Sequence, residues 1–150
     1  MKDRIKDILF AAIVIGGVAF FAVTGRSAET ERDYVHGAAP AVIAATFSSA
    51  WCASCKILEP KLADLAPVFA DQPVQFIKLD FTFGQYNEQK ARAAALNFEG
   101  VFNAYEGATG FTLLLDAETG VLIDTLTANH SKNAMEAAIA QALSIAQRNN

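Results

Sequence analysis

Short apolar runs alternate with helical patterns from about residue 41 to the end of the chain. Four runs of six or seven residues are mostly apolar or alternate between apolar and polar positions, which is typical of strands. They lie at 41–47, 74–79, 111–116 and 121–126. The first run is apolar almost throughout, and it therefore predicts a strand buried on both faces.

Three segments between and after these runs predict helices. The apolar residues of the first lie three or four positions apart, at Leu58, Leu62, Leu65 and Phe69, with Pro60 inside the segment. The second, 87–97, is rich in alanine and other good helix formers. The last begins after Ser131, a suitable N-terminal cap, and its apolar face consists of Met135, Ile139, Ala142, Leu143 and Ala146.

The connections between these elements complete an α/β plan. The stretch 98–110 contains three glycines and no clear period, so we predict a loop there. The turn at 117–120 is expected to join the last two strands as an antiparallel hairpin. The first two strands flank a helix and are expected to be parallel. The predicted order is strand, helix, strand, helix, strand, strand, helix, with helices on both faces of one sheet.

The first 25 residues have a different composition. Residues 8–25 contain no charge over 18 positions, and as a helix they would span about 27 Å, close to the thickness of a bilayer's hydrocarbon core. We predict a cytoplasmic tail at 1–7, a transmembrane anchor or uncleaved signal at 8–25, a tether at 26–39 and a domain at 40–150. Basic residues in the tail favour a domain that faces the periplasm or an equivalent extracytoplasmic space.

A cleaved signal peptide is the alternative interpretation of this region. The tail would serve as its basic segment, but a cut after Ala28 would place Arg26 where a small residue is required. We therefore favour retention as an anchor. From Ser27 onward, 8 Lys or Arg and 14 Asp or Glu give a formal charge of −6, and this balance argues against a nucleic-acid partner.

The chain has only two cysteines, Cys52 and Cys55, and they lie three positions apart. If Cys52 begins a helix, both sulfurs lie on nearly the same face and can form a small disulfide ring. The unpaired N–H groups and the dipole of a helix start stabilise a thiolate, which is the nucleophilic form. We predict Cys52 as the attacking thiol and Cys55 as the resolving thiol.

Other interpretations of the pair stay open. The cysteines could be buried apolar residues, a static disulfide or half of a zinc site. The two histidines, His36 and His130, do not stand at a paired-ligand spacing, so we predict no metal site. A metal-handling protein and a non-catalytic binding module remain the alternatives to redox chemistry.

The run 46–56, together with Pro60, resembles the active-site strand and helix of the thioredoxin family. Trp51, Cys52, Cys55 and Lys56 match the family pattern, and Ala53-Ser54 replaces its common Gly-Pro. The resemblance extends from about residue 41 to 146. It implies a thioredoxin-like α/β fold, with a central mixed β-sheet flanked by helices, preceded here by the predicted transmembrane helix.

Two positions depart from the family pattern. Thr46 stands where the family has a buried acidic residue, and Phe111 stands where it has a cis-proline. Without proline the Gly110–Phe111 bond is expected to be trans, so the docking edge would be rebuilt, with 105–111 as a partner-binding loop. Lys78 matches a family lysine near the missing acid, and the loss of that acid predicts slower turnover.

The resemblance implies a thiol–disulfide oxidoreductase that acts through Cys52 and Cys55. Together with the predicted anchor, it predicts a membrane-tethered protein that reduces or exchanges disulfides of exported proteins. Trp51, Gly110 and Phe111 would bind the partner, and Lys56 would tune the pKa of the neighbouring thiol. No cofactor is expected besides the redox-active disulfide. The expected partners are protein thiols and disulfides, with an upstream electron donor in the membrane if the protein acts as a reductant.

Overall fold

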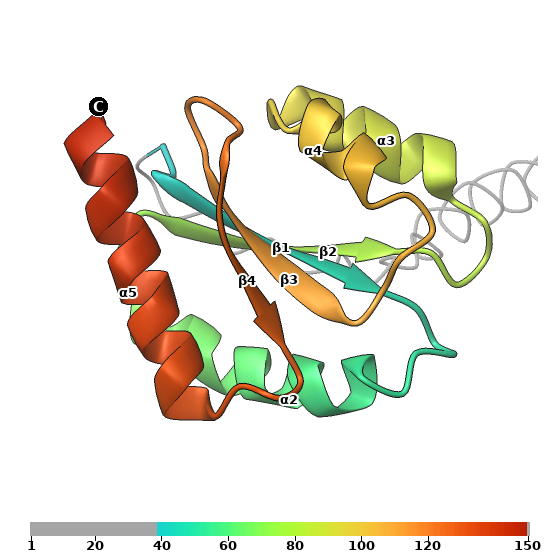
Figure 1. Ribbon diagram of the computed structural model, residues 1–150, viewed down its shortest axis with the longest axis horizontal. Helices are drawn as coiled ribbons and strands as arrows, with labels where there is room; N and C mark the ends of the chain where they lie inside the picture. Colours follow the sequence, from blue (N-terminus) through green and yellow to red (C-terminus); the bar gives the residue numbers. More distant parts are fainter. Residues whose placement is uncertain (1–38, 150) are drawn as a thin grey trace, which may run out of the picture. The chain divides into compact units, whose positions relative to one another are not determined.

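The computed structural model describes residues 39–149, which form a sheet with helices on both faces (Figure 1). The elements are β1 (Val42–Ser48), α2 (Cys55–Leu65), the 3₁₀ helix η1 (Ala66–Phe69), β2 (Val74–Asp80), α3 (Tyr86–Ala95), α4 (Glu99–Ala104), β3 (Phe111–Asp116), β4 (Leu122–Thr127) and α5 (Lys132–Asn149). The predicted anchor at 8–25 lies outside the described residues, as does almost all of the predicted tether at 26–39. None of the helices within 39–149 is long and apolar enough to cross a bilayer.

The sheet has four strands in the order β2-β1-β3-β4. β1 and β2 are parallel, with Val42 opposite Val74 and Ser48 opposite Asp80. β3 is antiparallel to both β1 and β4. The sheet is therefore mixed, and the parallel first pair and the antiparallel hairpin are both as predicted. Because β1 and β2 end at the same level, the loops that follow them emerge side by side at one edge of the sheet.

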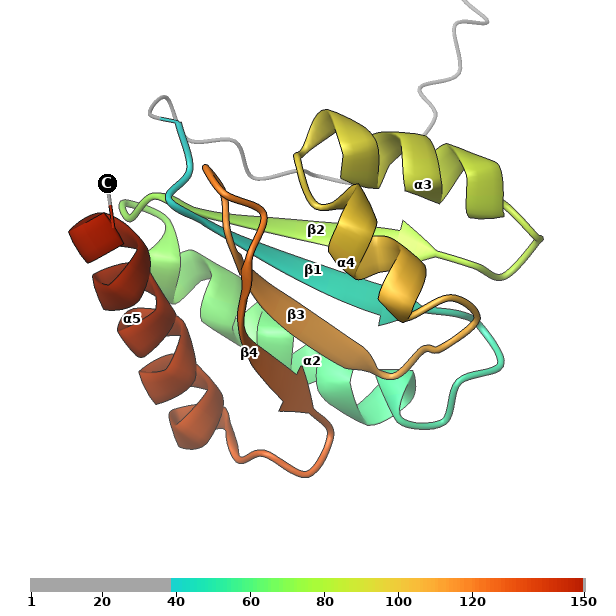
Figure 2. The same cartoon turned by 45° about the horizontal axis from the view of Figure 1, so that its top comes forward.

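The strand β1 separates two apolar clusters. All seven of its residues are buried, and alternate side chains point to opposite faces. Val42 and Ala44 pack with α2 and α5, whereas Ile43, Ala45 and Phe47 pack with α3 and α4. Figure 2 shows α2 and α5 on one face of the sheet and α3 and α4 on the other. The prediction of a first strand buried on both faces is confirmed.

The prediction of an unbroken loop at 98–110 is wrong, because this stretch contains the helix α4. Phe98 and Phe102 stand four residues apart and are both 1% exposed. The ring of Phe102 packs against Tyr86 and Phe47, with centroids 5.3 and 5.7 Å apart. Burial of these two aromatic side chains stabilises one and a half turns of helix although Gly100 lies within it. The extra helix follows α3 in the predicted order of elements.

The last helix, α5, follows the sequence prediction closely. The hydroxyl of Ser131 accepts a hydrogen bond from the N–H of Ala134 at 3.2 Å, which is the geometry of an N-terminal cap. The buried residues of α5 are the five that were predicted for its apolar face. Periodicity was a sufficient guide here because the helix packs on the sheet along a single stripe.

The β3–β4 turn is held by the carboxylate of Asp116. This group accepts hydrogen bonds from the backbone N–H groups of Glu118 and Thr119, at 3.0 and 2.9 Å. Burial raises the pKa of Asp116, but the hydrogen bonds from Thr119 and Glu118 outweigh it, so the pKa lies below its ordinary value. The turn ends at Gly120, which has a φ of 69° and lies against the backbone of Asn97 after α3.

We predict that Gly120→Ala destabilises the fold far more than Gly107→Ala. Both glycines have a positive φ, but a Cβ at Gly120 would lie 1.8 Å from the carbonyl oxygen of Asn97, whereas a Cβ at Gly107 meets nothing within 4 Å. Gly107→Ala should cost about 1 kcal/mol for its backbone conformation, and Gly120→Ala at least about 3 kcal/mol because the backbone must also move. Urea unfolding of both variants measures the difference, and equal losses would contradict the tight contact.

Candidate active site

The two cysteines lie where β1 passes into α2. Cys52 belongs to the turn before the helix, and its N–H donates to the carbonyl of Ser49 at 3.1 Å. The helix begins at Cys55, so the expectation that Cys52 begins it is wrong by three residues. The reason is local: the carbonyl of Ser54 is the first to accept helical hydrogen bonds, from Ile57 and Leu58 at 3.1 and 2.9 Å. Cys52 therefore lies in front of the helix start.

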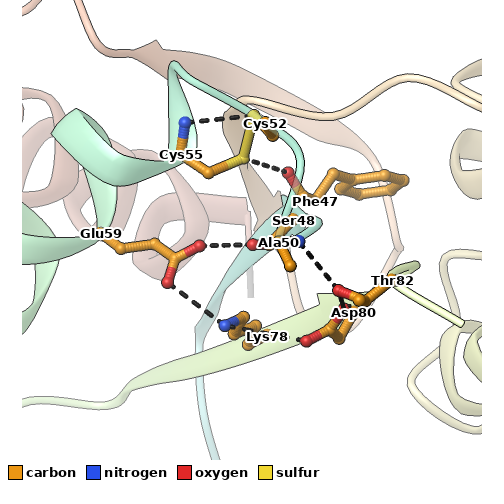
Figure 3. The surroundings of a disulfide bond; sticks show 9 residues. All are labelled: Phe47, Ser48, Ala50, Cys52, Cys55, Glu59, Lys78, Asp80 and Thr82. Atoms are coloured by element: carbon orange, nitrogen blue, oxygen red, sulfur yellow. Dashed lines mark hydrogen bonds and ion pairs between the residues drawn. A yellow bond between two sulfur atoms is a disulfide. The ribbon is translucent and has the colours of Figure 1, made fainter.

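This position places the sulfur of Cys52 at the N-terminal end of α2. The N–H of Cys55 points at Cys52 Sγ, with the two atoms 3.1 Å apart (Figure 3). It is one of the N–H groups that a helix start leaves without an intrahelical partner. Together with the helix dipole, such a group stabilises a thiolate when the cysteine is reduced. The electrostatic support that the sequence analysis expected for Cys52 is thus present in the geometry.

The two cysteines are joined in a disulfide, with their Cα atoms 5.3 Å apart. Their environments differ. Cys52 is half-buried, whereas Cys55 is 2% exposed and its sulfur lies 3.8 Å from the carbonyl oxygen of Phe47. A partner disulfide can therefore reach the first sulfur and not the second. This asymmetry matches the predicted attacking role of Cys52 and resolving role of Cys55, and both roles stay predictions.

Gly110 closes one side of the Cys52 sulfur. Its N–H donates to the carbonyl of Phe47 at 2.8 Å, and its φ is 100°. A Cβ at this position would lie 3.2 Å from Cys52 Sγ and 3.0 Å from the Cβ of Ser54. The segment before β3 can approach the disulfide this closely because residue 110 has no side chain.

Phe111 directs its ring into the molecule. The ring stacks on Phe47 with centroids 5.0 Å apart and contacts Tyr105 at 5.2 Å. No cis peptide bond occurs within residues 39–149, so the Gly110–Phe111 bond is trans, as the sequence analysis expected. The partner-binding roles of Gly110 and Phe111 stay predictions; the structure places the backbone of Gly110, and not the ring of Phe111, beside the sulfur.

Trp51 stands out from the surface beside the disulfide. Its side chain is 80% exposed, which is unlike an ordinary partly buried aromatic residue. Phe83, which the sequence analysis did not single out, is 83% exposed in the loop after β2. The N–H of Ala50 donates to the hydroxyl of Thr82 at 2.8 Å and ties the two loops together. Both rings therefore lie in neighbouring loops at the same edge of the sheet as Cys52.

A polar cavity of about 170 Å³ lies behind the disulfide, and its wall includes Ser48, Cys55, Lys56, Glu59, Lys78 and Asp80. Glu59 extends from α2, and its Oε2 lies 3.2 Å from Nζ of Lys78 on β2. The hydroxyl of Ser48 on β1 donates a short hydrogen bond to the other carboxylate oxygen of Glu59. Figure 3 shows this Ser48–Glu59–Lys78 chain directly below the cysteine pair.

Asp80 occupies the other end of the same cavity. Burial raises the pKa of Asp80. Hydrogen bonds from the side chain and backbone of Thr82, together with the charge of Lys78, lower the pKa by more than burial raises it, so it lies below its ordinary value. The nearest oxygen of Asp80 lies 3.9 Å from Nζ of Lys78. Lys56, the predicted pKa-tuning residue, is exposed in the first turn of α2, and its role stays a prediction.

Thr46 occupies the buried position where the resemblance led us to expect an acid. It is 6% exposed, and its hydroxyl is hydrogen-bonded to that of Thr112, its cross-strand neighbour, at 2.8 Å. The two hydroxyls satisfy each other, so no charge is required there. The carboxylate that pairs with Lys78 instead comes from Glu59. Its signal in the sequence was its spacing, four residues after Cys55 on the same helix face.

No group of three His, Cys, Asp or Glu side chains that could hold a metal ion occurs within residues 39–149. The two sulfurs are bonded to each other. The redox group that this site offers is therefore the disulfide itself, which needs no bound cofactor to exchange with another disulfide or thiol.

Comparison with known proteins supports the family that the motif indicated. Residues 27–99 match the family model described as Thioredoxin. A chloroplastic thioredoxin F of Oryza sativa subsp. japonica is 36% identical over 63 residues, which are 39% of this chain and 33% of the rice protein. The chain thus matches about a third of the length of this curated relative.

Two solved structures are also similar. A thioredoxin of Malassezia sympodialis has a TM-score of 0.48 at 24% identity, covering 70% of this chain and 80% of its own. A thiol:disulfide interchange protein of the thioredoxin family from Chlorobium tepidum TLS has a TM-score of 0.47 at 18% identity, covering 68% and 79%. The match over residues 27–99 includes β1, the Cys52–Cys55 pair, β2 and the paired Lys78, so this part of the chain, which holds the candidate site, matches the thioredoxin family.

Proposed function

We propose that this chain is a thiol–disulfide oxidoreductase that acts on protein disulfides through Cys52 and Cys55. The observation that carries the proposal is the contrast between the two sulfurs. Cys52 is half-buried and receives the N–H of Cys55 at 3.1 Å, whereas Cys55 is 2% exposed. A reachable, stabilised thiolate and a protected second thiol are what exchange through a mixed disulfide requires.

In the reductive direction the reaction has two steps. The thiolate of Cys52 attacks one sulfur of the partner's disulfide, a mixed disulfide forms and the partner's other sulfur leaves as a thiolate. Cys55 then loses its proton and attacks Cys52 Sγ, which reforms the Cys52–Cys55 disulfide and releases the partner's second thiolate. Two electrons pass from the dithiol to the partner, and the reverse sequence oxidises a partner dithiol.

The partner is expected to dock over Cys52 between two rims. One is the backbone at Gly110, which lies against the sulfur, and the other is Trp51, the residue before Cys52, which offers an exposed aromatic surface. Exposed aromatic side chains bind apolar surface at a low cost in conformational entropy. Phe83 extends this apolar rim across the neighbouring loop.

We place the domain on the extracytoplasmic side of a membrane, where it would act on exported proteins. The support for this location is the sequence alone: the charge-free stretch at 8–25 and the basic residues before it. Such a compartment favours disulfides, so a reductant there needs an upstream donor of electrons in the membrane. Retention of the full chain in membranes after an alkaline carbonate wash tests the anchor, and release into the wash would contradict it.

Cysteine variants should separate exchange from the alternatives. In reduced protein, Cys52 should be alkylated by iodoacetamide at pH 7 at least about tenfold faster than free cysteine, because the helix start favours its thiolate.

The Cys55→Ser variant should retain partners in mixed disulfides that dithiothreitol releases, detected by mass spectrometry. The control is Cys52→Ser, Cys55→Ser: partners that it retains would favour a non-catalytic binding module. Stoichiometric metal that depends on both thiols in anaerobically purified protein would favour metal handling.

The Gly110→Ala variant should slow exchange at Cys52. Its Cβ would lie 3.2 Å from Cys52 Sγ, whereas the Cβ of the matched Gly107→Ala variant, which also has a positive φ, meets open space. We expect exchange with a peptide disulfide to fall at least about tenfold in Gly110→Ala and less than about twofold in Gly107→Ala. Stopped-flow rates at equal protein concentration measure this, and equal rates would show that the close approach at Gly110 does not matter for docking.

A further inference from the structure

The second step of exchange requires Cys55 to lose a proton in a buried place. Cys55 is 2% exposed, and only a thiolate can attack the mixed disulfide at a useful rate. A buried thiolate is costly unless a nearby group takes up the proton. Thr46, at the position where the resemblance predicts an acid, is hydrogen-bonded to Thr112, and neither hydroxyl is a base at neutral pH.

The polar cavity connects Cys55 with two carboxylates, those of Glu59 and Asp80. Its volume of about 170 Å³ leaves room for a few water molecules, each of which takes about 30 Å³ in the liquid. Asp80 stands at the end of β2, and its Oδ1 already accepts hydrogen bonds from the side chain and backbone of Thr82 (Figure 3). Glu59 lies one helical turn after Cys55 on the same face of α2.

The neighbours of Glu59 hold its carboxylate on the cavity wall. Ser48 of β1 donates to one oxygen, and Lys78 of β2 lies 3.2 Å from the other. The charged and titratable groups around the cavity are Lys56, Lys78, Asp80 and Cys55 itself. Lys78, which contacts Glu59, has a side chain that is 37% exposed, so the Ser48–Glu59–Lys78 series of polar side chains reaches solvent. A proton taken from the cavity therefore has a route out.

We propose that Glu59 accepts the proton of Cys55 in the resolving step, in place of the acid that Thr46 replaces. The inference rests on the function proposed above. The Cys55 S–H bond breaks, its proton passes through cavity water to the carboxylate of Glu59, and the Cys55 thiolate attacks Cys52 Sγ. The Cys52–Cys55 bond forms as the mixed disulfide breaks, and the partner's sulfur takes the electron pair of the broken bond and leaves as a thiolate. The partner's thiolate then takes up a proton from solvent, and Glu59 releases its proton to solvent.

Reaction of the reduced full-length chain with one equivalent of dithiobis-nitrobenzoate tests this, because each step releases one coloured thiolate. The first release reports the attack by Cys52 and the second the attack by Cys55. At pH 7, Glu59→Gln should slow the second release at least about tenfold and change the first by less than about twofold. The difference should shrink as the pH rises well above about 8.5, the pKa of a free thiol, because the buried thiol then ionises increasingly without help.

Glu99→Gln is the matched control. Glu99 is also a helical glutamate paired with a lysine, Lys90, at 3.4 Å, but it lies on α4, away from the cavity. This variant should leave both releases unchanged. Ser48→Ala keeps the carboxylate and removes one of its hydrogen bonds, so a smaller slowing of the second release alone is expected. Should Glu59→Gln fail to fold, Glu59→Asp, which keeps a shorter acid, should give an intermediate second rate.

Two outcomes would overturn the proposal. An unchanged second release in Glu59→Gln would mean that another base, with Asp80 the first candidate, serves Cys55. Equal slowing of both releases at every pH, with a lowered Tm, would mean that Glu59 acts only in the fold. Failure of the proposed function is distinguishable, because the wild-type chain would then not release the second thiolate at all.

Discussion

The structure depends on the burial of one short strand on both of its faces. β1 packs against α2 and α5 on one side and against α3 and α4 on the other, and both of its edges are paired. A strand held in this way cannot slip by one residue without turning five apolar side chains to the wrong cluster. Its end at Ser48 is therefore fixed, and so is the starting point of the turn that holds Cys52.

The same register explains why polar chemistry is concentrated at one edge. The parallel pairing of β1 with β2 sets Ser48 beside Asp80 and brings the following loops together. The helix α2 then covers this edge with Cys55 and Glu59 on its inner face. Of the two carboxylates beside Lys78, the nearer one, Glu59 at 3.2 Å, comes from this helix, and Asp80 at 3.9 Å comes from β2. The Thr46–Thr112 pair fills the vacated position without charge.

Much of the fold was predictable from the sequence because its signals were local. The strands, the parallel pair, the hairpin and the face of α5 followed from periodicity and turn residues. The helix α4 did not, because it is stabilised by tertiary contacts. Phe102 packs against Tyr86 and Phe47, which are distant from it in the sequence, and local periodicity does not show these contacts. The start of α2 was misplaced because it depends on the geometry of the preceding turn. This geometry decides which carbonyl accepts the first helical hydrogen bond, and the spacing of the cysteines does not reveal it. Glu59 was missed for a related reason, since its partners lie on two strands.

The bare backbone at Gly110 has a consequence for how such a protein diversifies. The wall nearest to the reacting sulfur consists of peptide atoms and a hydrogen, so substitutions elsewhere cannot alter its chemistry. Under the proposed function, recognition of the partner then falls to outlying, solvent-facing side chains such as Trp51 and Phe83. Those positions can be exchanged at little cost to folding, so new clients can be acquired while the reaction itself is preserved.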